Sequence, residues 1–110
     1  MVIKKEELEK MMCYAMRYAI GRRTYAVSNV CEFYLERLYE WSNNCLMQAI
    51  KDIDSARSLG DPNIDMPKWL NLRKECYELL LSRVNYDKEK LNGIEKEYTG
   101  ENLIENSFRK

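Results

Sequence analysis

The segment from Tyr14 to Tyr25 holds the residues of this chain that are best suited to bind an anion. Arg22 and Arg23 follow a glycine and immediately precede the expected start of a helix. Two guanidinium groups and the free backbone N–H groups of a helix N-terminus would converge there on one negatively charged group. Thr24 adds a hydroxyl group at the same point. The segment therefore predicts an anion site.

Aromatic residues surround this pair of arginines: Tyr14, Tyr18 and Tyr25. Aromatic rings stack on nucleobases while arginines hold phosphate, so the combination suits a nucleotide. A second interpretation needs no ligand, because Arg22 and Arg23 would also complement the C-terminal dipole of the preceding helix or pair with glutamates. The tyrosines would then be half-buried core residues. The sequence leaves both interpretations open.

The chain has few residues or motifs that are suited to catalysis. It contains no histidine, which excludes Ser–His and Cys–His nucleophilic pairs, and it has no G-x-S-x-G, P-loop or G-x-G-x-x-G motif. Glu36 with Glu40, and Asp52 with Asp54, fall on charged helical faces, and we interpret them as solvated surface rather than acid–base pairs. We expect a protein that is not an enzyme, with no catalytic residues and no cofactor.

The cysteines are too far apart in sequence to predict a metal site. They are Cys13, Cys31, Cys45 and Cys76, with no C-x-x-C pair and no histidine to join them. Each lies on or beside an apolar helical stripe, so we expect small buried side chains in a reducing compartment, with disulfides as the alternative. No metal site is predicted.

Composition and charge narrow the class of protein further. The 110 residues fit one domain, and the 18 basic and 18 acidic side chains cancel, which argues against general nucleic-acid binding. The N-terminus lacks the apolar core of a signal peptide, and no apolar run approaches the length of a membrane span. These features predict a cytoplasmic protein with no membrane contact.

Apolar residues recur at helical spacing through most of the chain and predict an all-α fold. The first helix is expected from Lys4 to Ile20, with Gly21 ending it, and the second from about Tyr25 to Glu40, with Thr24 as its N-cap. Met11, Met12 and Met16 form a stripe on the first helix that would face a second copy in a homo-oligomer.

Two further main helices and a weaker one follow. A polar break at residues 42–44 precedes a third helix that stops at Gly60, and a Gly-Asp-Pro-Asn loop precedes a fourth, with Asp65 as its cap and Pro67 in its first turn. Trp69 is expected in the core. Residues 1–85 would thus form a small bundle of four main helices, and residues 86–110 a short peripheral helix, interrupted at Gly93, with a mobile tail in the same domain.

Four short segments resemble parts of a known group of proteins. They are Tyr18-Ala-Ile-Gly-Arg-Arg-Thr-Tyr-Ala-Val-Ser28, Asp52-Ile-Asp54, Leu59-Gly-Asp61 and Asp65-Met-Pro-Lys-Trp69. The chain is similar there, over roughly residues 14 to 72, to small uncharacterised proteins of bacteriophages and prophages of Gram-positive bacteria. The resemblance implies a phage context in the host bacterial cytoplasm but no activity and no site residues.

Small phage proteins without catalytic motifs often act by stoichiometric binding, including against host defence. The first hypothesis is a sponge that sequesters a nucleotide signal of the host immune system through Arg22, Arg23, Thr24 and the adjacent tyrosines. The second is an anti-CRISPR-like inhibitor that binds a host protein through a charged helical surface. The third is a small helix-turn-helix regulator of DNA, against which the acidic residues of the second helix argue, since they would repel phosphates.

Overall fold

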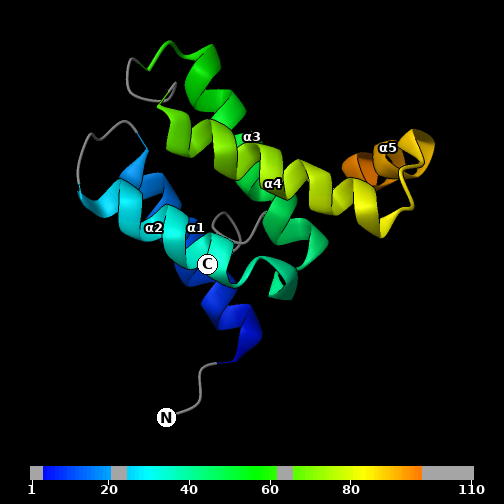
Figure 1. Ribbon diagram of the computed structural model, residues 1–110, viewed down its shortest axis with the longest axis horizontal. Helices are drawn as coiled ribbons and strands as arrows, with labels where there is room; N and C mark the ends of the chain where they lie inside the picture. The colour runs from blue at the N-terminus through cyan, green and yellow to red at the C-terminus, as the bar shows by residue number, and fades with distance from the viewer. Residues whose placement is uncertain (1–3, 21–24, 62–65, 98–110) are drawn as a thin grey trace, which may run out of the picture.

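The computed structural model describes residues 4–20, 25–61 and 66–97, and helices account for most of them. No strand occurs in these ranges, so the all-α prediction is confirmed for the part of the chain that the structure describes. In chain order the elements are α1 Lys5–Ala19, α2 Tyr25–Glu36, the 3₁₀ turn η1 Leu38–Glu40, α3 Asn43–Ser58, α4 Pro67–Arg83 and α5 Lys88–Glu97 (Figure 1).

The helices pack as two neighbouring pairs, α1 with α2 and α3 with α4. α1 and α2 lie side by side, α3 and α4 form the most extensive contact, and α1 with α3 and α2 with α4 close the core between the pairs (Figure 1). α5 lies at the far end of α4 and packs against it. The C-terminal end of α1 and the start of α2 lie together at one corner of the molecule (Figure 1).

The core is built from the apolar stripes that the helical spacing predicted. Its largest fully buried side chains include Trp41, Trp69, Tyr34 and Met16. Met16, Tyr34 and Trp69 belong to α1, α2 and α4, and Trp41 directly follows η1. Burying such side chains is the main favourable term in folding a domain of this size. The expected core position of Trp69 is confirmed.

α2 ends four residues earlier than the sequence predicts. The α-helix stops at Glu36, and residues 38–40 form the 3₁₀ turn instead. The physical reason is Trp41, whose indole Nε1–H donates to the backbone carbonyl of Tyr34 at 2.9 Å. In a continuing α-helix that carbonyl would accept from the N–H of residue 38, so the indole takes over its pairing and places Trp41 in the core.

The polar break predicted before α3 supplies the N-cap of that helix. Ser42 is the N-cap residue, and its hydroxyl accepts a hydrogen bond from the backbone N–H of Cys45 at 3.1 Å. At α4, Pro67 stands in the first turn as predicted, but the N-cap residue is Met66 rather than Asp65, and its side chain makes no capping bond. Asp65 itself lies outside the described residues.

α5 is one helix that runs through Gly93, so the predicted interruption there is wrong. Leu91 is buried and Ile94 packs against the core, which supplies enough anchoring to carry the helix across the glycine. α1 ends at Ala19, with Ile20 as its C-cap. The predicted roles of Gly21 and Thr24, and the predicted tail after residue 97, lie outside the described residues. None of the described helices has the length and apolar character needed to cross a membrane.

Candidate functional site

The structure describes two of the predicted ligand-binding side chains. Tyr14 and Tyr18 stand one helical turn apart on α1, with 40% and 63% of their side-chain surface exposed. Their positions at i and i+4 put both rings on one face of the helix, close to its C-terminal end. Tyr25 is the first residue of α2, but its side chain, together with Arg22, Arg23 and Thr24, lies outside the described residues. The described part of the site is therefore an aromatic surface that leads toward the junction of α1 and α2.

Arg17 lies between these two tyrosines in sequence and binds across to α3. Its guanidinium contacts the carboxylate of Asp52 at 3.4 Å, and Gln48 donates a second hydrogen bond to the same carboxylate oxygen at 2.7 Å. Only 11% of the Asp52 side chain is exposed. Burial raises the pKa of this carboxyl, while Arg17 and Gln48 oppose that shift. The interpretation of Asp52 as solvated surface is thus wrong, because the packing of α1 on α3 covers it.

Asp54 belongs to a second ion pair, on the outer side of α3. Arg73 of α4 donates to both of its carboxylate oxygens, at 2.7 and 3.1 Å, and the same guanidinium lies 5.9 Å from the ring centroid of Tyr77. The hydrogen bond to Asp54 raises the pKa of Arg73. These charges line a small pocket of about 110 Å³ between α3, α4 and α5, but they neutralise each other across it.

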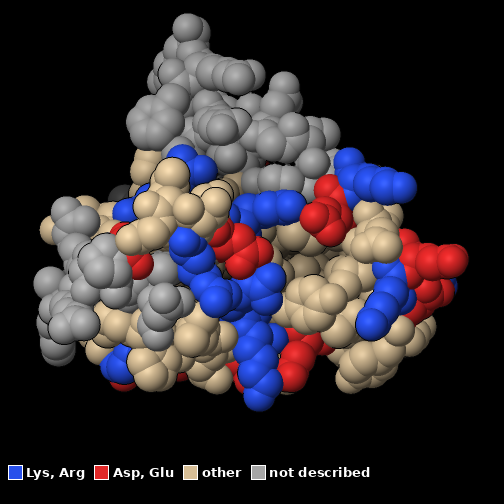
Figure 2. Space-filling model, turned by 90° about the horizontal axis from the view of Figure 1, so that it is seen from above, with Lys and Arg blue, Asp and Glu red and all other residues tan. Residues whose placement is uncertain are grey.

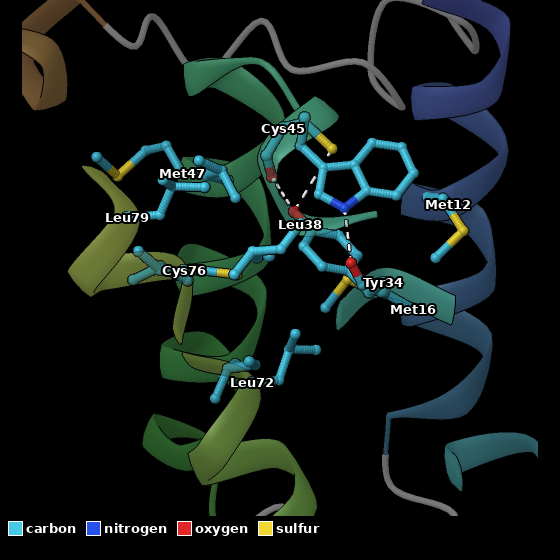
Figure 3. Packing of buried hydrophobic residues seen from close by; sticks show 14 of the residues in the cluster. Met12, Met16, Tyr34, Leu38, Cys45, Met47, Leu72, Cys76 and Leu79 are labelled. Atoms are coloured by element: carbon cyan, nitrogen blue, oxygen red, sulfur yellow. Dashed lines mark hydrogen bonds between the residues drawn. The ribbon is translucent and has the colours of Figure 1, made fainter. Parts of the chain in front are cut away.

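A buried polar cluster occupies the centre of the fold, around Tyr34 (Figure 3). The Tyr34 hydroxyl donates to the backbone carbonyl of Cys45 at 3.1 Å and lies 3.5 Å from its Sγ atom. Cys76 and Cys13 approach the same group from α4 and α1. Three cysteines far apart in sequence, Cys13, Cys45 and Cys76, therefore gather near one phenol, which spacing alone does not reveal.

This gathering produces neither a metal site nor a reactive thiol. All four cysteines are free and buried, as the sequence predicts for small core side chains. Burial raises the pKa of Cys31 to about 11 and that of Cys76 to about 12. Thiols held in the protonated form are poor nucleophiles and poor metal ligands. Within the ranges that the structure describes, no group of three or more Cys, Asp or Glu side chains is arranged to hold a metal ion.

Basic side chains gather on the face that carries the end of α3 (Figure 2). Lys and Arg residues form a band over the middle of that face, with Asp and Glu side chains beside it. Because acidic side chains lie beside it, the band is a local concentration of positive charge within a mixed charged surface.

An open apolar groove runs between α1 and α2, with a volume of about 280 Å³. Its lining consists of Leu8, Met11, Met12, Ala15, Asn29, Val30 and Phe33. The predicted methionine stripe divides here: Met12 and Met16 are buried in the core of the same chain, whereas 53% of Met11 is exposed in the groove. The expectation that all three methionines face a second copy is therefore wrong for Met12 and Met16.

The sequence identified neither Arg17 nor Glu9 as a residue with a specific partner. Glu9 is buried, and it shares the core-facing side of α1 with Met12 and Met16, three and seven residues further along. An acidic residue in phase with a core stripe is the signal that would have identified it, because buried carboxylates need partners.

Comparison of this chain with protein-family models, with curated proteins and with solved structures finds no match.

Proposed function

We propose that this chain is a non-catalytic binding protein that captures an anionic nucleotide where α1 ends and α2 begins. The observation that carries the proposal is the exposure of Tyr14 and Tyr18 on one face of α1, immediately before the sequence Gly21-Arg22-Arg23-Thr24. These two large aromatic side chains are exposed and precede a pair of adjacent arginines in the sequence. That pairing of ring and cation is what a nucleotide requires.

The chemistry divides between the two parts of the site. One tyrosine ring stacks on a nucleobase, Arg22 and Arg23 hold the phosphate, and the N-terminus of α2 adds the partial positive charge of its free N–H groups. Nothing in this arrangement supplies a nucleophile or a general base, so the ligand would be held and not converted.

In the phage context that the sequence resemblance implies, such a protein would act as a sponge. A host immune signal that is a cyclic or ADP-ribose-like nucleotide would be sequestered stoichiometrically, without turnover. Tight binding is essential to this role, because a sponge works only when its concentration exceeds both the signal and the dissociation constant.

Isothermal titration calorimetry of the full chain tests the proposal. The titrants are cyclic dinucleotides, cyclic trinucleotides, ADP-ribose and cyclic ADP-ribose, and one of them is expected to bind with a submicromolar Kd and to be recovered intact. Arg22→Ala or Arg23→Ala should weaken that binding by roughly 10-fold or more, since each removes a charge-assisted contact. Tyr18→Ala should weaken it by roughly 5-fold or more.

Tyr39→Ala is the matched control, because Tyr39 is also largely exposed but belongs to η1, far from the junction in sequence. It should bind the nucleotide as the unmodified chain does. Absence of heat with every titrant, or equal losses in Tyr39→Ala and Tyr18→Ala, would refute the proposed site.

A second candidate function is the capture of a host protein, as in an anti-CRISPR-like inhibitor. The observation that favours it is the mixed charged surface of Figure 2, where basic and acidic side chains lie beside one another among uncharged residues. Such surfaces suit protein partners and give orientation as well as affinity. A pull-down from host lysate separates the two functions, because this one predicts a specific co-purified protein whose binding is insensitive to nucleotide.

A helix-turn-helix role has less support. Glu32 and Glu36 are exposed along α2, the helix that would have to enter the major groove of DNA. Carboxylates on that face would meet the phosphate backbone and repel it. A gel shift at low salt should accordingly show no complex.

A further inference from the structure

The apolar groove between α1 and α2 is an open hydrophobic surface, and it is not part of the proposed nucleotide site. Met11 of α1 is 53% exposed in the groove, and Phe33 of α2 also lines it. Exposed apolar surface of this kind costs free energy in water and commonly marks a contact with another protein surface. Methionine adapts to differently shaped partners, which suits Met11 to such a contact.

Opposite charges stand at one end of the groove. Lys4 precedes Leu8 by one turn on the α1 side, and Glu36 follows Phe33 by about one turn on the α2 side. Both side chains are exposed, and neither makes an ion pair with another residue of the described ranges. The groove therefore ends in a cation on one rim and a carboxylate on the other.

Two copies of the groove, stacked face to face, match each other in charge and in apolar contacts under one particular two-fold rotation. Rotation by 180° about an axis along the groove lays α1 of one copy over α2 of the other, because the two helices run antiparallel and side by side (Figure 1). Leu8 then faces Phe33 of the second copy, and Lys4 faces its Glu36. Each contact occurs twice, as in any isologous interface.

The other two-fold rotation that stacks these faces does not match the charges. An axis across the groove would lay α1 over α1 with the helices reversed, which moves Lys4 to the end of the groove that is remote from Glu36. We propose that the groove is covered by a second copy of this chain, with α1 over α2 and Lys4 paired to Glu36 in both directions. This inference does not depend on the proposed nucleotide function.

The area of the face formed by α1 and α2 sets the expected affinity of the dimer. α1 has 15 residues and α2 has 12, so their shared face is about 20 Å long and about 20 Å wide. That is roughly 400 Å² per partner, about half of a standard stable interface. The dimer is therefore a reversible one, with a Kd on the order of micromolar.

Sedimentation equilibrium of the full chain from about 1 to 500 µM tests the proposal, with the 13.2 kDa chain as the reference mass. The expected result is a monomer–dimer equilibrium. Met11→Glu, which places a carboxylate in the groove, should raise the Kd at least about 30-fold. Leu59→Glu is the matched control, because Leu59 is 87% exposed at the end of α3 and outside the groove, and it should leave the Kd unchanged.

Charge reversal tests the orientation. Lys4→Glu and Glu36→Lys should each raise the Kd about 10-fold, and the double variant Lys4→Glu/Glu36→Lys should restore it to within about 3-fold of the original. Circular dichroism of each variant verifies that the fold is retained. A monomer at every concentration, dimerisation of Met11→Glu equal to that of Leu59→Glu, or a double variant no better than the single ones would overturn the proposal.

Discussion

The carboxylate of Glu9 in α1 accepts two hydrogen bonds from Ser42, the residue that caps α3. Its Oε2 atom lies 2.6 Å from the Ser42 backbone nitrogen, and its Oε1 atom lies 2.9 Å from the Ser42 hydroxyl oxygen. In a capping box, a glutamate in the first turn of the same helix bonds the N-cap backbone N–H. Here a different helix supplies that glutamate, so the start of α3 is fixed by α1.

Removal of this carboxylate should destabilise the fold substantially. Glu9→Ala removes the acceptor of the part-buried Ser42 backbone N–H and is expected to lower the free energy of unfolding by about 2–3 kcal/mol. Urea denaturation followed by circular dichroism measures the loss. Glu7→Ala is the control, since Glu7 is exposed in the same helix, and a loss as large as that of Glu9→Ala would contradict the role of the Ser42 contact.

The two buried tryptophans should respond differently to replacement by phenylalanine. Trp41→Phe removes the donor to the Tyr34 carbonyl, whereas the Nε1 atom of Trp69 has no hydrogen-bond partner among the described residues. Both variants lose side-chain volume, but only Trp41→Phe leaves a buried carbonyl, that of Tyr34, without its indole donor. Trp41→Phe should therefore lower the free energy of unfolding by at least about 1 kcal/mol more than Trp69→Phe. Thermal denaturation of both variants measures the two losses of stability. Equal losses would show that the hydrogen bond of the Trp41 indole contributes no stability.

Two glycines should respond in opposite directions to alanine. Gly93 lies in the middle of α5 with open space where a Cβ would be, so Gly93→Ala should stabilise the chain by about 0.5–1 kcal/mol. Gly60 has a φ of +77°, which alanine adopts only with strain, so Gly60→Ala should destabilise it by about 1–2 kcal/mol. Paired melting curves test both, and two shifts of the same sign would argue against this account of the α3 and α5 backbone.

Stability should fall as the pH rises above about 9. Burial raises the pKa of Cys31 from 9.0 to about 11 and that of Cys76 to about 12, so these thiols stay protonated in the fold while the unfolded chain loses their protons. The stabilisation is complete below the unfolded pKa and is lost as the pH approaches the folded one, at up to about 1.4 kcal/mol per pH unit for each thiol. Urea titrations at pH 8, 9 and 10 measure the slope, and Cys76→Ala should make it shallower. A slope that Cys76→Ala leaves unchanged would assign the effect to other groups.

The helices were predictable because each is indicated by residues close together in the sequence. Apolar residues at spacings of three and four identify the buried faces of α1, α3 and α4, and Ser42 is recognisable as a cap from its residue type alone. The end of α2 was not predictable in this way. Trp41 replaces a local hydrogen bond of the helix with a long-range one, and periodicity carries no sign of that exchange.

The candidate site was predictable only in part. The exposure of Tyr14 and Tyr18 agrees with a surface role, although their spacing in sequence was equally consistent with a half-buried one. The convergence of the cysteines on Tyr34 and the burial of Asp52 depend on how the helix pairs pack. Contacts between helices are set by three-dimensional geometry that single-sequence patterns do not contain.

The most direct test of the proposed function is the response of the eight tyrosine rings to a nucleotide. With ¹³C-labelled tyrosine, NMR spectra of the full chain titrated with the nucleotide panel report each ring separately. The account predicts that one nucleotide shifts the signals of Tyr14, Tyr18 and Tyr25 while those of Tyr39 and Tyr86 stay in place. Shifts confined to Tyr39 and Tyr86, or none with any member of the panel, would contradict it.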